Sequence, residues 1–483
     1  MMMDYYRKTT RLKLGFAPTR RALSGEKVFN KDEAKRQKDG IEAKIKSWGA
    51  EVVNLDFLNE EGLLYEGADG EAVARRFMAE EVDALFVPHC NFGNEEAVAR
   101  MAKQINKPLL LWGPRDDAPL PDGFRLRDSQ CGLFATSKVL SRCGVPFTYI
   151  TNCRLEEELF ERGFRNFLGA AAAVKAFKRL RLGQISTRPG AFWSVKCNEA
   201  ELLERFGIEI VPITLADLRR MLDAVRQDHG GEVRREIDRI GAAIARIEFD
   251  AEGLARAAAL KLAIRRWAED EGLTAAASQC WGPMVDTAGI CPCFSLSELT
   301  DDGLPVICEA DIHGAISAVL VQAAQLGRSP IFLADVTVRH PENDQAELFW
   351  HCGVFPKSLA REDRETVLTT QFNRKIPAVG AWEIKGGDIT IARFDGAAGE
   401  YSLLMGHGRG VAGPATIGTY VWVEFNDWPK WEHQFIHGPY IHHCVGVHGQ
   451  IAPVLYEACR YIPGLKADPV DPTAAEIERS WRV

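Results

Sequence analysis

The first third of the chain alternates short apolar runs with longer segments in which apolar residues recur every three or four positions. The short runs have the length of buried strands, and the longer segments have the period of helices. The predicted strands are Leu12–Phe16, Glu51–Leu55, Ala84–Val87, Pro108–Trp112 and Phe147–Ile150. The predicted helices are Lys31–Trp48, Glu71–Ala79, Asn94–Ile105 and Gln130–Cys143. Strands separated by helices form βαβ units, so residues 1–170 are expected to be a parallel, doubly wound α/β domain.

A second alternating region begins after a basic, alanine-rich helix predicted over Phe164–Arg181. Its predicted strands are Leu182–Ser186, Ile208–Ile213 and Leu273–Ser278. Its predicted helices are Leu215–Gln227, Arg234–Ile247 and Leu254–Glu271. Residues 171–328 are therefore expected to be a second parallel, Rossmann-like α/β domain, and this domain carries Glu309.

The pattern changes after about residue 330. Short apolar runs such as Ile389–Arg393, Tyr401–Met405 and Tyr420–Glu424 are separated by Gly, Asp and Pro, without a long helical period. Residues 329–483 are therefore expected to be a mostly antiparallel, β-rich domain, either a barrel or a sandwich, that carries His351 and His443.

Composition narrows the class of protein. The chain has 483 residues, 46% hydrophobic and 26% charged, which is typical of a folded protein of several domains. A net charge of −8 argues against a nucleic-acid partner, and no apolar run approaches the ~20 residues that span a bilayer. The stretch Met1–Lys13 lacks the apolar segment of a secretory signal, and the twelve cysteines are scattered. We therefore expect a cytoplasmic protein with reduced thiols and no membrane or nucleic-acid partner.

Chemistry-bearing residues gather in the second half, where nine of the eleven histidines fall between His313 and His448. A short apolar strand ends at Glu309, an apolar helix follows over residues 311–326, and a strand over Ile331–Ala334 ends at Asp335. This order predicts a right-handed crossover between parallel strands of one sheet. Both acids would then lie at the carboxyl ends of neighbouring strands, where open α/β sheets bind ligands.

Two carboxylates at such an edge repel each other unless a cation lies between them. The downstream imidazoles, His351 and the adjacent pair His442-His443 with His448 beyond, would complete a site for Mn²⁺, Co²⁺ or Fe²⁺, with Mg²⁺ less favoured because of the nitrogen ligands. His442 and His443 are adjacent, so on a strand their side chains point to opposite faces and at most one would reach the metal. The alternative is that the acids are satisfied by backbone N–H groups and that His351 is an interior histidine. His313, one turn beyond Glu309, would line the same pocket or lie on the helix surface.

Four segments resemble the L-fucose isomerase and L-arabinose isomerase superfamily. The segment Val306–Ala315 is similar to the one that carries the first acidic ligand of that family, and Phe332–Val336 to the one that carries the second. Trp350–Gly353 resembles the histidine-containing segment, and His442-His443 resembles the C-terminal histidine pair, of which the second is the ligand. The resemblance therefore implies Glu309, Asp335, His351 and His443 as metal ligands. The layout of two α/β domains and a β-rich domain also matches.

The resemblance implies a Mn²⁺-dependent aldose–ketose isomerase that acts on a sugar or a modified, possibly acidic, sugar through a metal-bound enediolate. Glu309 and Asp335 would be the catalytic acid and base, and the protein would be a homotrimer or homohexamer. Gln279, at the end of a predicted strand, is a candidate for binding substrate hydroxyls. Trp281 and Trp350 are candidates for an apolar wall, or are core aromatics. The alternatives are a metal-dependent lyase or epimerase and a non-catalytic sugar-binding protein.

Overall fold

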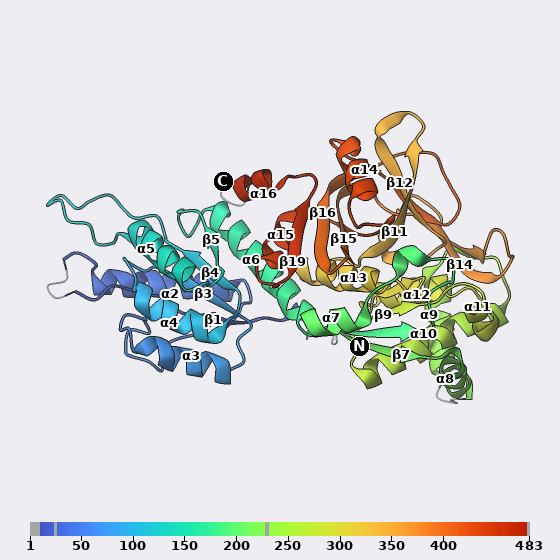
Figure 1. The fold of residues 1–483 in the computed structure, drawn as a ribbon, viewed down its shortest axis with the longest axis horizontal. Coiled ribbons are helices and arrows are strands. Elements are labelled where there is room, and N and C mark those ends of the chain that lie inside the picture. The colour runs from blue at the N-terminus through green and yellow to red at the C-terminus, as the bar shows by residue number, and fades with distance from the viewer. Residues whose placement is uncertain (1–9, 24–26, 228–230, 481–483) are drawn as a thin grey trace. The chain divides into compact units, whose positions relative to one another are not determined.

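The computed structural model describes residues 10–23, 27–227 and 231–480 (Figure 1). Of the N-terminal stretch Met1–Lys13, residues 1–9 lie outside the described residues. The chain divides into two compact units. One is formed by Arg11–Val174 with residues 460–462 and 475–480, and the other by Lys175–Cys459 and Pro463–Ala474.

The N-terminal unit is built on a five-stranded parallel sheet with the order β2-β1-β3-β4-β5 (Figure 1). The strands are β1 (Lys13–Phe16), β2 (Glu51–Val53), β3 (Ala84–Pro88), β4 (Leu109–Trp112) and β5 (Thr148–Ile150). The helices are α2 (Lys31–Ser47), α3 (Asp69–Ala79), α4 (Glu95–Ile105), α5 (Ser129–Arg142) and α6 (Glu158–Phe177). Apolar residues of α3, α4 and α5 pack on one face of the sheet, and those of α2 and α6 on the other. The predicted doubly wound sheet is confirmed.

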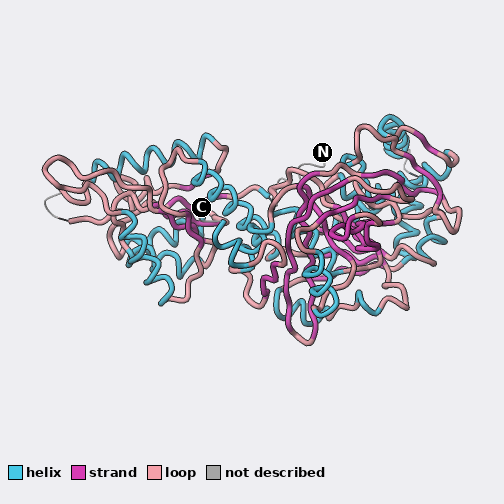
Figure 2. Tube along the Cα trace, turned by 90° about the horizontal axis from the view of Figure 1, so that it is seen from above, coloured by secondary structure: helices cyan, strands magenta, loops and turns pink. Residues whose placement is uncertain are grey.

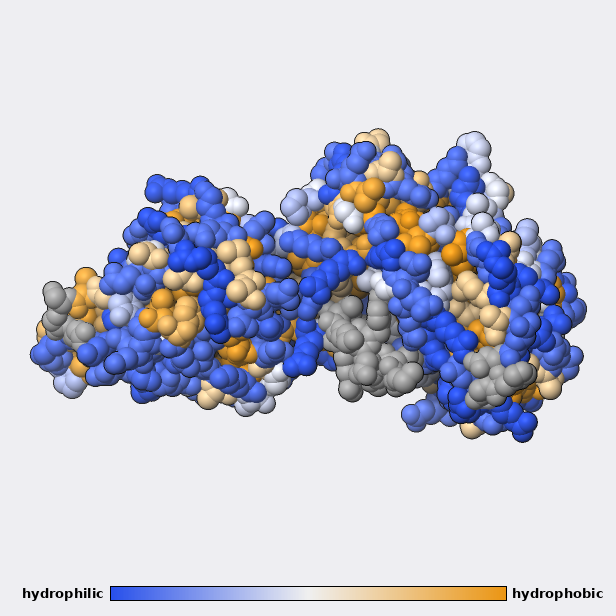
Figure 3. Space-filling view, turned by 90° about the horizontal axis from the view of Figure 1, so that it is seen from below, coloured by the Kyte–Doolittle hydropathy of each residue, from blue (hydrophilic) through white to orange (hydrophobic). Residues whose placement is uncertain are grey.

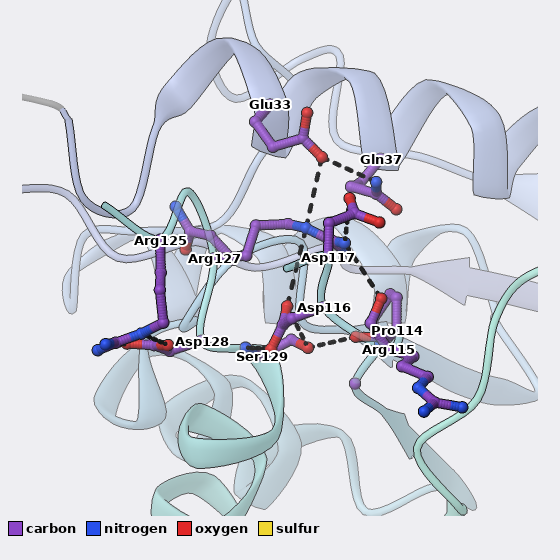
Figure 4. A network of polar contacts seen from close by, with 12 residues as sticks. Glu33, Gln37, Pro114, Arg115, Asp116, Asp117, Arg125, Arg127, Asp128 and Ser129 are labelled. Atoms are coloured by element: carbon purple, nitrogen blue, oxygen red, sulfur yellow. Dashed lines mark hydrogen bonds and ion pairs between the residues drawn. The ribbon is translucent and has the colours of Figure 1, made fainter. Parts of the chain in front are cut away.

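One buried arginine fixes the loop between β4 and α5 in this unit (Figure 4). The Nε of Arg127 lies 3.4 Å from Oε1 of Glu33 and 3.7 Å from Oδ1 of Asp116. Its Nη2 lies 3.3 Å from Oδ2 of Asp117, and Oδ2 of Asp116 accepts the N–H of Ser129 at the start of α5. Because Glu33 belongs to α2 and the other acids to the loop, the guanidinium ties the loop to that helix.

The larger unit contains a four-stranded parallel sheet with the order β10-β9-β6-β7. The strands are β6 (Arg181–Ile185), β7 (Glu209–Ile213), β9 (Ala275–Ser278) and β10 (Val306–Cys308). The accompanying helices are η1 (Trp193–Val195), α7 (Glu199–Phe206), α8 (Leu215–Gln227), α9 (Glu232–Ala243), α10 (Ala251–Glu271), α11 (Pro283–Ala288), α12 (Cys293–Asp301) and α13 (Ile312–Ala324). The second parallel α/β region is thus confirmed, although the apolar pattern did not predict α7, α11 and α12.

Six antiparallel strands of the same unit close into a barrel, the magenta windings of the larger body in Figure 2. The barrel strands are β11 (Phe332–His340), β12 (Asn343–His351), β15 (Gly387–Ala397), β16 (Glu400–Val411), β17 (Thr419–Glu424) and β18 (His443–His448). They pair in the order β11-β12-β17-β16-β15-β18, and β18 returns to β11. The additional strands are β8 (Arg246–Ile247), β13 (Val367–Thr370), β14 (Pro377–Glu383) and β19 (Leu465–Pro469). Helices η2 (Lys357–Leu359), α14 (Trp428–His437) and α15 (Ala452–Cys459) complete this unit, whereas α16 (Ala474–Ser480) belongs, apart from Ala474, to the N-terminal unit. The predicted β-rich region is a barrel.

The predicted crossover between β10 and β11 is wrong. β10 is the edge strand of the parallel sheet, whereas β11 pairs antiparallel with β12 and β18 in the barrel. Between them, α13 is buried on every side rather than along one stripe, because it packs against β9 and also against β15 and β18. Asp335 is not at a strand end either, since β11 continues to His340. α13 is therefore the element that joins the parallel sheet to the barrel.

The face drawn in Figure 3 is mostly hydrophilic and the cysteines are unpaired, as the composition of the chain led us to expect. Across the described part of the chain, no helix combines the length and the apolar character needed to cross a membrane. All twelve cysteines are free thiols.

Packing inside the barrel leaves no room for a side chain at Gly446. This residue of β18 is paired with Phe332 of β11, and a Cβ atom at Gly446 would overlap the Phe332 ring. We expect Gly446→Ala to lower the free energy of unfolding by about 1–3 kcal/mol, as overpacking of a core does. Urea denaturation measures this, and Gly241→Ala, in an open position of α9, is the control that should not destabilise.

Candidate functional site

Glu309 lies at the carboxyl end of β10 in a strained turn. Glu309 and Ala310 both have left-handed backbones, with φ of 65° and 54°. Each such residue costs on the order of 1–3 kcal/mol, and strain of this kind gathers at functional sites. The turn is held by the N–H of Ala310, which donates to the carbonyl of Ser278 on β9. The Glu309 side chain is buried, with 7% of the residue exposed.

Glu309 and Asp335 meet at His443. Asp335 of β11 is the direct antiparallel partner of His443 on β18. The Nε2 atom of His443 lies 3.0 Å from Oε2 of Glu309 and 3.5 Å from Oδ1 of Asp335. The structure therefore brings the two acids and this imidazole together, although through the junction of sheet and barrel and not through neighbouring strands of one sheet.

A third carboxylate, which the sequence analysis did not single out, orients the His443 ring. The Nδ1–H of His443 donates to Oδ2 of Asp311 at 2.9 Å, so Nε2 is the atom that faces Glu309 and Asp335. Asp311 also caps α13 by accepting the N–H of Gly314. Burial opposes a charge on His443, but its hydrogen bond to Asp311 and the neighbouring carboxylates of Glu309 and Asp335 raise its pKa to about 10. In the absence of a metal, the imidazolium is thus the cation that these carboxylates attract.

The carboxylate of Asp311 is also the first group in a series of buried, mutually paired polar side chains. Arg393 of β15 has no exposed surface and contacts Asp311 through Nη1 and Nη2 and Asp395 through Nε. Asp395 in turn accepts a hydrogen bond from Nδ1 of His313 at 2.8 Å. His313, predicted to bind substrate, therefore lies in this buried series, and its Nε2 lacks a partner among the described residues.

Glu309 is held in its charged form. Burial opposes ionisation of its carboxyl group, but the nearby imidazoles of His443, His351 and His442 hold its pKa below the usual range. A carboxylate that stays ionised is able to accept a proton or to bind a cation.

The imidazoles of His351 and His442 differ in position and in contacts. His351, at the end of β12, is buried, and its Nδ1 accepts the N–H of Cys352 at 2.8 Å. A neutral ring in this arrangement carries its proton on Nε2 and donates from it. His442 precedes β18, and its Nε2 lies 4.0 Å from Oδ1 of Asp335. Because His442 is outside the strand, the strand-based expectation that at most one of the two rings could reach a shared ion does not apply, and both imidazoles lie near Asp335.

The remaining predicted residues are spread over the same unit. Gln279 follows β9 and is buried, and its Oε1 has no partner among the described residues. Trp281 is 42% exposed and packs against Phe192 and the guanidinium of Arg374. Trp350 is half-buried and donates its indole N–H to the carbonyl of Ile417. Gln279 is thus one strand away from Glu309 in the parallel sheet.

The side chains around His443 offer oxygen and nitrogen atoms of the types that bind a divalent metal ion. Among the described residues, Oδ1 of Asp335 and Nε2 of both His351 and His443 are buried without a geometrically good hydrogen bond. One ligand atom from each of Asp335, His442 and His443 lies within 4.8 Å of the others. Carboxylate oxygens mixed with imidazole nitrogens are ligands that suit Mn²⁺, Fe²⁺ or Co²⁺.

Two cavities reach residues adjacent to this group. One, of about 510 Å³, is lined by Val336 and His442, next to Asp335 and His443. The other, of about 430 Å³, is lined by Ala310, next to Glu309. A small molecule therefore has space next to residues that flank Glu309, Asp335 and His443 in the chain, although these three side chains do not themselves line either cavity.

Known proteins resemble this chain over most of its length. The family model for the fucose/sulfoquinovose isomerase N-terminal domain matches residues 22–178. A sulfoquinovose isomerase of Priestia aryabhattai is 29% identical over 388 residues, 79% of this chain and 84% of the relative. A sulfoquinovose isomerase of Alkalicoccus urumqiensis is 27% identical over 332 residues, 69% of this chain and 73% of the relative. The comparisons therefore confirm that this chain resembles proteins of the fucose isomerase-like family.

Proposed function

We propose that this protein is a divalent-metal-dependent aldose–ketose isomerase that acts on an acidic hexose. The observation that carries the proposal is the convergence of Glu309 and Asp335 on Nε2 of His443 in a chain that resembles this family. The names of the relatives support sulfoquinovose, a hexose with a sulfonate on its sixth carbon, as the substrate class.

Glu309, Asp335 and His443 would hold the ion, with Mn²⁺ favoured over Co²⁺, Fe²⁺ and Mg²⁺. His351 can join them as a fourth ligand only by giving up its hydrogen bond from Cys352, because that bond leaves the ring proton on Nε2. When bound, the ion supplies a Lewis acid that polarises the sugar carbonyl and offsets the charge of an enediolate.

The protein residues then move the proton. One of the carboxylates, Glu309 or Asp335, takes the proton from the carbon next to the carbonyl, and the same group or its protonated partner returns it to the neighbouring carbon. In the metal-free protein the pKa of Glu309 lies below its usual range, so its side chain is a carboxylate that can accept a proton. His351, as oriented, donates a hydrogen bond from Nε2 to a substrate oxygen, and Gln279 offers its amide to a hydroxyl.

Removing the carboxylate behind His443 should weaken metal binding. We expect Asp311→Asn to reduce Mn²⁺ affinity roughly 10- to 100-fold, because the outer partner no longer fixes the Nδ1–H form of the ring. Titration calorimetry of the metal-free protein measures the affinity. Asp395→Asn is the matched control: it also takes a carboxylate from Arg393 but does not touch His443, so it should keep the Mn²⁺ affinity.

Incubation with Mn²⁺ and a panel of neutral, carboxylated and sulfonated aldoses tests the reaction. Conversion to a ketose of unchanged mass supports the isomerase. Fragments of lower mass indicate a lyase, inversion at one carbon indicates an epimerase, and binding without turnover indicates a sugar-binding protein; each of these outcomes rejects the proposal.

A further inference from the structure

The cavity of about 430 Å³ connects the Glu309 turn with the loop after β6. Its lining includes Gln184, Thr187 and Arg188 at the end of β6, Lys196 and Glu199 further along the chain, and Ala310. In the parallel sheet, β6 is separated from β10 by β9 alone. The cavity therefore lies along the carboxyl edge of the sheet, where α/β folds bind ligands.

Two cations of this cavity are not neutralised by the protein. Arg188 is half-buried, and its Nη1 donates to the carbonyls of Pro189 and Gly190 at 3.0 and 2.9 Å. The ammonium group of Lys196 lies 4.4 Å from the centre of the Trp193 ring. In the described ranges, neither Arg188 nor Lys196 forms an ion pair, although many other basic side chains of the same unit do, such as Arg205 and Arg220.

The balance of charge in the cavity is positive. Glu199, in the first turn of α7, is the acid that opposes Arg188 and Lys196. The hydroxyl of Thr187 and the amide of Gln184 add neutral groups that can donate hydrogen bonds. The guanidinium of Arg188 is half-buried and held by carbonyls of its own loop, but it has further N–H groups that can donate to an oxyanion. A guanidinium can bind an oxyanion through two parallel hydrogen bonds.

The spacing of the strands matches a six-carbon chain. Neighbouring strands lie about 4.8 Å apart, so the ends of β10 and β6 are separated by on the order of 10 Å. A sugar whose reacting carbons lie at Glu309 and whose middle hydroxyls pass Gln279 would extend its far end to Arg188. We propose that this cavity binds a tetrahedral anionic group, a sulfonate or a phosphate, on the carbon most distant from the reacting end. The proposal rests on the proposed function, because it takes Glu309 as the reacting end.

The test compares three hexoses that differ at the sixth carbon: sulfoquinovose, its 6-deoxy analogue without the sulfonate, and glucose 6-phosphate. Binding to the full-length protein loaded with Mn²⁺ is measured by titration calorimetry, and kcat/KM by ketose formation. We expect a preference for one anionic sugar over the 6-deoxy sugar, and which of the two is preferred identifies the anion. Arg188→Gln should reduce this preference roughly 10- to 100-fold, since a hydrogen bond to a charged group is lost.

Controls separate a local effect from a loss of folding. Arg188→Lys keeps the charge and should reduce the preference less than Arg188→Gln, and Lys196→Gln should also reduce it. Arg220→Ala removes an exposed cation of α8 that is paired with Asp217, and it should leave the preference unchanged. Circular dichroism checks that each variant is folded.

The outcomes distinguish this inference from the proposed function. If no sugar is isomerised, the proposed function fails, while the binding arm still tests the anion site. If the wild-type protein binds the 6-deoxy sugar as well as both anionic sugars, or if Arg188→Gln and Lys196→Gln both keep the preference, the anion site is rejected even when isomerisation is observed.

Discussion

Replacing Glu309 with Gln, or Asp335 with Asn, is expected to reduce kcat for isomerisation by at least roughly 100-fold, the lower range of what a positioned acid or base contributes. The same variants should also weaken Mn²⁺ binding. Loss of a residue that only hydrogen-bonds to a metal ligand typically costs roughly 10- to 100-fold in affinity, and loss of a ligand itself should cost more. The reason is that each change removes a charged oxygen that lies within 3.5 Å of Nε2 of His443. Steady-state kinetics and Mn²⁺ titration calorimetry measure the two effects.

Glu342→Gln is the matched control for these variants. Glu342 is an exposed acid in the turn between β11 and β12 of the same barrel. Its neutralisation should leave turnover and Mn²⁺ affinity unchanged. Near-normal turnover by either Glu309→Gln or Asp335→Asn would remove the proposed acid–base roles.

The elements that the sequence predicted best are those with the clearest periodicity. The N-terminal strands are short, mostly apolar runs bounded by amphipathic helices, and the structure has each of them within a few residues. Asn94 lies just before α4 and accepts the N–H of Ala97, as an N-cap does. Helices α14 and α15 were missed, because ten residues or fewer give too few turns for a period to stand out among short strands.

The prediction of a crossover between β10 and β11 was wrong for a physical reason. An apolar helix between two apolar strands is typical of a βαβ unit, but the same pattern occurs when the helix is buried between two different sheets. Every residue of α13 from Ile312 to Ala324 is buried, which the sequence expresses as an apolar helix without a polar face. Beyond Ala334, β11 becomes half-exposed and polar, so its continuation to His340 leaves no apolar signal.

Some residues of the candidate site could be found from short sequence segments, and others could not. Glu309, Asp335 and His443 were found because acids after apolar strands and a histidine pair are visible in short segments. Arg393 was not found, since an arginine in a strand is ordinary until the fold places it against an acid 82 residues away. The interactions that orient the site come from long-range contacts, and single-sequence patterns do not contain them.

Arg393→Met is expected to lower the free energy of unfolding by about 3–5 kcal/mol, the usual cost of removing one partner from a buried ion pair. The arginine has no exposed surface and lies between Asp311 and Asp395, whose charges would remain buried without it. Both carboxyl groups are buried, which opposes their ionisation, and Arg393 and neighbouring histidines hold their pKa values below the usual range. Urea denaturation of the metal-free protein at neutral pH measures the loss.

The triple variant Asp311→Asn, Arg393→Met, Asp395→Asn separates the charge effect from lost packing. If uncompensated carboxylates cause the instability, neutralising both acids in the Arg393→Met background should recover part of the free energy of unfolding. Equal stability of Arg393→Met and the triple variant would contradict this account. Recovery of stability without recovery of Mn²⁺ affinity would further show that Asp311 has two separable roles, one in pairing the buried arginine and one in holding His443 with Nε2 toward the acids.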